Sequence, residues 1–270
     1  MSVQIDQGRL GSFRALLLVQ AAVAGLFGLS TFLAPERFAA FTGYTGHQPF
    51  FYRLVGAATL GYGVVALAAY WERVPWQQVR IPIVAAFTFN LAAVVASLLS
   101  LADGDRQPLV YFVLVAAAAF TVVAAYWLRR NQGIPLAENR RISSNFRAVI
   151  LMATAAAAFF GVVPLLLARP LASAAGFKTD DLFILRGAAA ATLGYAVAGV
   201  LQLRSSVWSA IRLQVIAALV FNGLSVIGAA LYLLSGGRSL VGWLILVAAT
   251  IFTVGLAWGF GAVRAAGTPV

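Results

Sequence analysis

The segment Arg53-Leu-Val-Gly-Ala-Ala-Thr-Leu-Gly-Tyr62 returns 133 residues later as Arg186-Gly-Ala-Ala-Ala-Ala-Thr-Leu-Gly-Tyr195. Seven of the ten positions are identical, and each copy stands near the start of a long apolar run. Self-similarity at a fixed spacing is the signature of an internal repeat. The shared Arg, Thr, Gly and Tyr are not positions that apolar helices match by composition alone.

The similarity continues beyond this segment. Ala85-Ala86-x-x-Phe89-Asn90 matches Ala217-Ala218-x-x-Phe221-Asn222, and Phe120-Thr121-Val122 matches Phe252-Thr253-Val254, both at an offset of 132. We therefore predict two repeats, residues 1–133 and 134–270, joined by a basic connection near 129–141.

Composition places the chain in a membrane. Hydrophobic residues make up 62% of the 270 positions, charged residues only 10%, and the mean hydropathy is +0.91. The apolar residues fall in blocks of about twenty, the length that crosses a bilayer core as a helix. Backbone amides in lipid must be bonded within their own segment, so these blocks are predicted to be helices.

The sequence predicts an all-α polytopic membrane protein with eight transmembrane helices, arranged as two parallel four-helix repeats. Repeats with an even number of helices share one orientation and are related by an axis along the membrane normal. The expected spans are residues 13–33, 50–71, 81–101, 108–128, 146–167, 182–203, 211–234 and 240–260.

Cations predict the orientation. With both termini inside, twelve of the 19 Lys and Arg residues lie on the cytoplasmic side. The positive-inside rule then favours cytoplasmic termini. Arg-rich and Ala-rich usage suggests a bacterial protein, hence one of the bacterial inner membrane. The cations fall between apolar blocks rather than on one surface, so we expect no nucleic-acid partner.

Arg53 and Arg186 are the first candidate binding residues, because each is predicted to lie about one turn below the outer interface. Charges inside a bilayer are rare and need a partner. Each side chain could reach loop carbonyls or lipid phosphate. Alternatively, the two could converge near the pseudo-twofold axis and bind an anionic headgroup.

Four further polar residues carry the repeat into the apolar spans: Tyr62, Tyr195, Asn90 and Asn222. Buried amides and hydroxyls need hydrogen-bond partners. The Asn side chains are expected either to bond neighbouring helices or to line a central cavity. At 100° per residue Tyr62 lies away from Arg53 on its helix, so the two should serve different neighbours.

Absences narrow the chemistry. The chain has no Cys and one His, and no predicted span contains Asp or Glu. Thiol chemistry and Cys-ligated metals are excluded, and proton-coupled transport loses the intramembrane acid it normally uses. We predict no catalytic residue, no metal site and no cofactor.

Each half, with Arg-x₃-Ala-Ala-x-Leu-Gly-Tyr opening its second helix, resembles the small four-helix bacterial membrane proteins of the DoxX-like kind. The resemblance covers about 120 residues of each half. It implies the architecture and carries over no catalytic residue.

These observations favour a non-enzymatic membrane protein, an accessory or scaffold subunit that binds lipid or a membrane-protein partner. Membrane lipids are the expected partners, with another membrane protein or a second copy of the chain as alternatives. The alternative function is a passive transporter or channel with a polar pathway on the pseudo-twofold axis. A lipid-modifying enzyme is disfavoured because no intramembrane acid or base is available.

Overall fold

The computed structural model describes residues 7–45, 48–131, 141–177, 182–205 and 207–265. The predicted boundary between the repeats, at residues 133 and 134, lies outside these described residues. In chain order the helices are α1 (Gln7–Leu33), α2 (Pro35–Thr42), α3 (Pro49–Glu72), α4 (Trp76–Ala102), α5 (Pro108–Arg130), α6 (Ser144–Leu166), α7 (Ala168–Ala174), α8 (Leu182–Ser205), α9 (Trp208–Leu234) and α10 (Leu240–Ala265).

The all-α prediction is confirmed: the described residues form helices and no sheet, and eight helices are long and apolar enough to cross a membrane. The predicted spans agree with these helices within a few residues, except that α1 starts at Gln7 instead of residue 13, α10 ends at Ala265 instead of residue 260, and α4 starts at Trp76 instead of residue 81. Pro82 therefore lies inside α4 rather than in its first turn.

Two short helices were not predicted. α2 and α7 occupy stretches read as connections, because each is too short and too polar to resemble a span. Pro35 at the first position of α2 was an available signal, since its fixed φ suits a helix start. Gly43, with a φ of 67°, ends α2 in the left-handed conformation that glycine adopts without strain.

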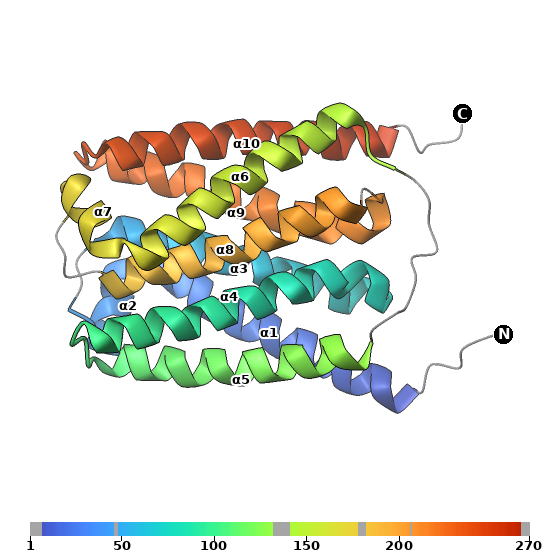
Figure 1. Ribbon diagram of the computed structural model, residues 1–270, viewed down its shortest axis with the longest axis horizontal. Helices are drawn as coiled ribbons and strands as arrows, with labels where there is room; N and C mark the ends of the chain where they lie inside the picture. Colours follow the sequence, from blue (N-terminus) through green and yellow to red (C-terminus); the bar gives the residue numbers. More distant parts are fainter. Residues whose placement is uncertain (1–6, 46–47, 132–140, 178–181, 206, 266–270) are drawn as a thin grey trace.

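The long helices lie side by side, with α3 and α8 at the centre of the bundle (Figure 1). α1 packs on α3 and α6 on α8, while α5 packs on α4 and α10 on α9. The same pairs of elements thus meet in both halves. This is what a twofold relation requires, and the superposition of the two repeats stays a prediction.

The halves interlock rather than standing apart. α3 packs along α9 and α4 along α8, whereas α3 touches α4 only lightly within its own half. Close packing of α1 on α3 uses glycine: a Cβ on Gly56 would lie 2.8 Å from the Gly28 carbonyl oxygen. Small residues let membrane helices approach in this way, where no hydrophobic effect drives them together.

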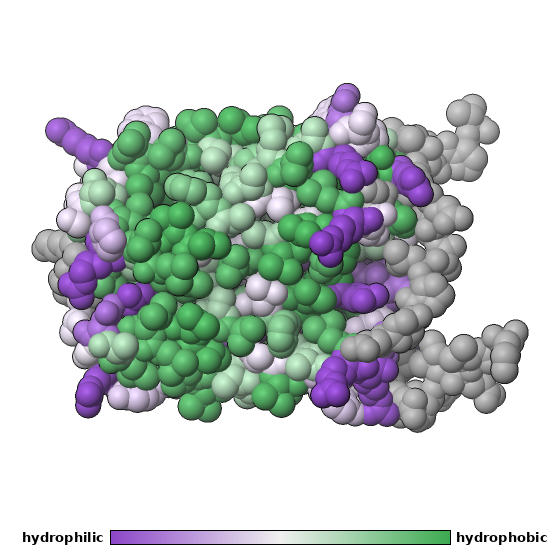
Figure 2. All heavy atoms as spheres, in the orientation of Figure 1, coloured by the Kyte–Doolittle hydropathy of each residue, from purple (hydrophilic) through white to green (hydrophobic). Residues whose placement is uncertain are grey.

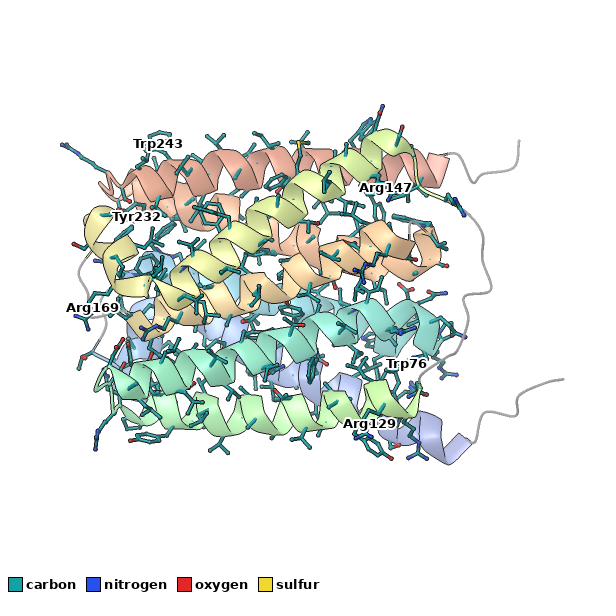
Figure 3. The ribbon with its side chains drawn as sticks, viewed as in Figure 1. Trp76, Arg129, Arg147, Arg169, Tyr232 and Trp243 are labelled. Atoms are coloured by element: carbon teal, nitrogen blue, oxygen red, sulfur yellow. The ribbon has the colours of Figure 1, made fainter. Side chains whose placement is uncertain are left out.

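An apolar band covers the middle of the face shown in Figure 2, and hydrophilic residues gather at its two ends. Exposed large side chains on α1, α5, α6 and α10 form this band, among them Leu26, Phe112, Phe159 and Ile251. Trp76, Arg129 and Arg147 lie at the end where α1 begins, and Arg169 and Trp243 lie at the opposite end (Figure 3). This distribution is typical of a protein embedded in a bilayer.

Candidate functional site

Tyr62 and Tyr195 meet where α3 crosses α8. Their ring centroids are 4.8 Å apart. Tyr62 donates a hydrogen bond to the Ala191 carbonyl oxygen at 2.9 Å, and Tyr195 donates one to the Ala58 carbonyl oxygen at 2.9 Å. Each hydroxyl therefore bonds the other half at the corresponding position, and the buried rings fill the space between the two central helices.

Glycine at two matching positions makes room for these hydroxyls. A Cβ on Gly61 would overlap the Tyr195 hydroxyl, and a Cβ on Gly194 would overlap the Tyr62 hydroxyl. The Gly-Tyr pair that ends each copy of the repeated segment is therefore one packing device used twice. The glycine of one copy receives the tyrosine of the other.

Arg186 is buried, and the Asp103 carboxylate balances its charge. Its Nη2 lies 2.6 Å from the Asp103 carboxylate and its Nη1 donates to the Ser100 hydroxyl at 3.1 Å. Ser100 is near the end of α4 and Asp103 caps that helix. The sequence analysis did not select Asp103 as a site residue, because its partner lies 83 residues away along the chain.

Arg53 has a different environment. Its Cβ faces α9, where a Cβ on Gly228 would lie 3.3 Å away. Positions 232 and 235, which match Ser100 and Asp103 at the offset of 132, hold Tyr and Ser, so no acid stands there. The buried Arg53 Nε has no hydrogen-bond partner among the described residues. The two arginines thus lie against different helices, and only Arg186 is paired with an acid.

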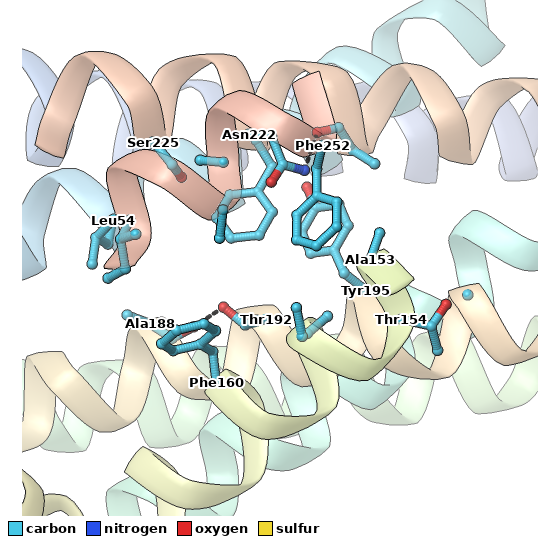
Figure 4. Close-up of a pocket in the computed structure, with 18 of the residues that line it drawn as sticks. Leu54, Ala153, Thr154, Phe160, Ala188, Thr192, Tyr195, Asn222, Ser225 and Phe252 are labelled. Carbon is cyan, nitrogen blue, oxygen red and sulfur yellow. Dashed lines mark hydrogen bonds between the residues drawn. The ribbon is translucent and has the colours of Figure 1, made fainter. Parts of the chain in front are cut away.

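Two cavities of about 130 Å³ each occur at matching places in the two halves. The α6–α10 cavity is lined by α6, α8, α9 and α10 with the start of α3 (Figure 4). The α1–α5 cavity is lined by α1, α3, α4 and α5 with the start of α8. Partly exposed residues of the outer helices, such as Ala116 of α5 and Ala248 of α10, form part of each lining.

The linings correspond residue by residue. Thr59, Tyr62, Phe89, Asn90, Ala117 and Phe120 line the α1–α5 cavity. Their counterparts Thr192, Tyr195, Phe221, Asn222, Ala249 and Phe252 line the α6–α10 cavity. Each cavity also receives a residue from the other half at a matching position. Ile184 of α8 lines the α1–α5 cavity, and its counterpart Phe51 of α3 lines the α6–α10 cavity. The repeated segment therefore builds a pair of equivalent cavities.

Asn90 and Asn222 line these two separate cavities and so do not share a central pathway. Each amide donates to the carbonyl oxygen four residues earlier in its own helix, Asn90 to Ala86 at 2.7 Å and Asn222 to Ala218 at 2.8 Å. The expected bond to a neighbouring helix is replaced by a bond within the helix.

The α6–α10 cavity is longer along the helix axis than its counterpart, and its deep end is the end at Gln202 and Gln214. Along α8 its lining extends from Leu185 to Gln202, which is about 26 Å at the helical rise of about 1.5 Å per residue. Along α3 the α1–α5 cavity extends only from Val55 to Tyr62, about 10 Å. Sequence reasoning did not select the residues of the deep end, because Gln202 and Gln214 have no repeat partner.

Among the described residues, no group of three His, Asp or Glu side chains could hold a metal ion. The fold and the apolar band define the class, a polytopic helical membrane protein, and two apolar cavities lie within its bundle. Comparison with protein families, with curated proteins and with solved structures found no match for this chain. The DoxX-like resemblance stays a prediction.

Proposed function

We propose that the chain is a non-enzymatic integral membrane protein that binds lipid between its helices, as an accessory or scaffold subunit of the bacterial inner membrane. The distribution of cations supports cytoplasmic termini, because twelve of the 19 Lys and Arg residues would then lie on the inner side. The observation that carries the proposal is the pair of matching apolar cavities, each lined in part by partly exposed residues of two outer helices, α1 and α5 or α6 and α10.

Cavity size indicates what such a site takes. An engineered apolar cavity of about 150 Å³ holds one benzene molecule. A cavity of about 130 Å³ therefore encloses a segment of a hydrocarbon chain rather than a whole phospholipid. The remainder of the chain would lie in the groove between the two outer helices, where apolar side chains such as Phe112 face the bilayer.

Arg53 is the better of the two arginines for an anionic headgroup. Arg186 already has a carboxylate and a hydroxyl as partners, so an additional anion would have to displace them. Arg53 is only half-buried and its Nε has no partner among the described residues. Its neighbour Leu54 lines the α6–α10 cavity, so Arg53 stands next to that cavity on α3 without being part of its lining.

The alternative, a passive channel on the pseudo-twofold axis, has less support. The axis is occupied by the Tyr62 and Tyr195 rings, and the two Asn side chains line different cavities. A polar pathway would require the two central helices to separate at this crossing.

Filling the cavities tests the proposal. Ala116→Phe and Ala248→Phe each place a ring inside one cavity. The matched controls Ala119→Phe and Ala257→Phe add the same ring at exposed positions of the same helices, outside the linings. We expect each cavity variant to copurify with less lipid per protein in detergent-free nanodiscs, measured by mass spectrometry. Equal lipid content in all four variants would refute lipid binding in these cavities.

A further inference from the structure

Gln214 of α9 is a buried polar residue whose side chain makes no hydrogen bond among the described residues. Its side chain is 1% exposed and lines the α6–α10 cavity. Neither Nε2 nor Oε1 has a hydrogen-bond partner among the described residues. A buried amide without partners carries a desolvation penalty of about 1–3 kcal/mol per group. Such a residue is expected where something other than the protein completes its hydrogen bonds.

A second unpartnered group lies on the same face of α9. Ser225 is 3% exposed, lines the same cavity and has no partner for its Oγ. It follows Gln214 by 11 residues, which at 100° per residue returns to within about 20° of the same direction. The two groups are therefore about 16 Å apart along one wall of the cavity.

The other half has neither group. The positions that match Gln214 and Ser225 are Pro82 and Ala93, neither of which carries a hydrogen-bonding side chain. The helix packing is repeated without these polar groups, so the packing does not depend on them. They distinguish the α6–α10 cavity from its counterpart.

Charge limits what the occupant can be. No charged side chain lines the α6–α10 cavity. An ionised group placed beside Gln214 would lose its hydration without gaining a counterion, which costs far more than burying a neutral polar group. The occupant's polar group must therefore be uncharged.

We propose that the α6–α10 cavity binds an uncharged long-chain amphiphile, a molecule with a hydroxyl, ester or amide group and a hydrocarbon chain. Its polar group bonds Gln214 at the deep end, and an oxygen further along the molecule can reach Ser225. The inference deepens the proposed lipid binding and rests on it. The α1–α5 cavity takes hydrocarbon without this preference.

This ligand is distinct from an anionic lipid at Arg53. Arg53 faces α9 at Gly228, which is 14 residues from Gln214 and therefore about 21 Å away along the helix. A lipid with its only polar group at Arg53 would place a hydrocarbon end against the Gln214 amide. The two polar features thus select two different molecules.

The test uses three photoactivatable probes with the same chain: a long-chain alcohol, the corresponding hydrocarbon and the corresponding phosphate monoester. Each carries its diazirine near the head and is added to the full chain in nanodiscs. We expect the alcohol to label peptides of α8 and α9 around Gln202 and Gln214 more strongly than either other probe. A net hydrogen bond of about 0.5–1.5 kcal/mol corresponds to a preference of about two- to tenfold.

Gln214→Leu should remove that preference while leaving hydrocarbon labelling unchanged. The same variant should unfold at a higher detergent concentration, because it deletes an unpartnered buried amide. Asn90→Leu is the matched control, since Asn90 is a partly exposed amide that lines the α1–α5 cavity. It should leave the alcohol preference intact.

The outcomes separate the two proposals. Equal labelling by the alcohol and the hydrocarbon, or an alcohol preference that survives Gln214→Leu, overturns the neutral-headed ligand alone. Lower stability of Gln214→Leu would also overturn it, because it would show that the amide supports the fold. Failure of every probe to label either cavity overturns lipid binding itself.

Discussion

The reciprocal Gly-Tyr contacts predict which pairs of substitutions compensate for one another. Gly61→Ala places a Cβ against the Tyr195 hydroxyl and 2.7 Å from the Ala217 carbonyl oxygen. Gly194→Ala does the same against Tyr62 and lies 2.6 Å from the Ala85 carbonyl oxygen. Overfilling a packed interior costs about 1–3 kcal/mol. We expect each alanine variant to lose stability by about that amount.

Removing the overlapped hydroxyl should recover part of the loss. Tyr195→Phe alone forfeits one buried hydrogen bond, about 0.5–1.5 kcal/mol, or about 0.6 kcal/mol on the average for membrane proteins. Combined with Gly61→Ala, it also relieves the steric overlap. We therefore expect a favourable coupling of about 1 kcal/mol in a double-mutant cycle. The rescue is partial, because the Ala217 carbonyl oxygen still crowds the new methyl group.

The control lies within the same four residues. Tyr62→Phe makes an equal chemical change but leaves the overlap at Gly61 in place, so its coupling to Gly61→Ala should be smaller than about 0.5 kcal/mol. Equilibrium unfolding in mixed detergent micelles measures all the variants. Compensation between Gly61 and Tyr62 equal to that between Gly61 and Tyr195 would refute the crossed arrangement of α3 and α8.

Three further outcomes are expected. Asp103→Asn should destabilise the protein by about 1–3 kcal/mol in the same unfolding assay. Breaking a fully buried ion pair costs about 3–5 kcal/mol, and the loss should be smaller here because the Asp103 side chain is 37% exposed. Unchanged stability would contradict the ion pair with Arg186. Arg53→Gln should lower the anionic phospholipid that copurifies with the protein, whereas Arg106→Gln, at an exposed arginine, should not; equal losses would argue against a specific site. A single cysteine placed in 131–139 should resist membrane-impermeant reagents in intact cells, and rapid labelling would reverse the orientation.

The eight spans were predictable because their signal is local. Twenty apolar residues in succession admit one structure in a bilayer, whatever surrounds them. The short helices α2 and α7 were not predictable in the same way, since neither carries a periodicity long enough to recognise. The start of α4 was placed too late because its first five residues, Trp76 to Arg80, are mostly polar and stand before the apolar run.

The candidate site was predicted only where the repeats agree. Tyr62, Asn90 and their counterparts drew attention by recurring, and each lines one of the two cavities. Asp103 and Gln214 escaped notice because they break the repeat, and contacts between distant segments leave no trace at short range. In this chain, positions that differ between the repeats contribute an ion pair and a buried amide, as well as the polar residues that the repeats share.

The packing of α3 on α9 and of α4 on α8 also bears on how the sequences of the two halves can diverge from each other. A homodimer of one four-helix protein could form the same interlocked pair, but every substitution would then appear in both of its subunits. A single continuous polypeptide removes that constraint. One half can keep an acid opposite its arginine, or acquire a buried glutamine in its cavity, while the other half does not, and one molecule thereby contains two unequal cavities within one fold.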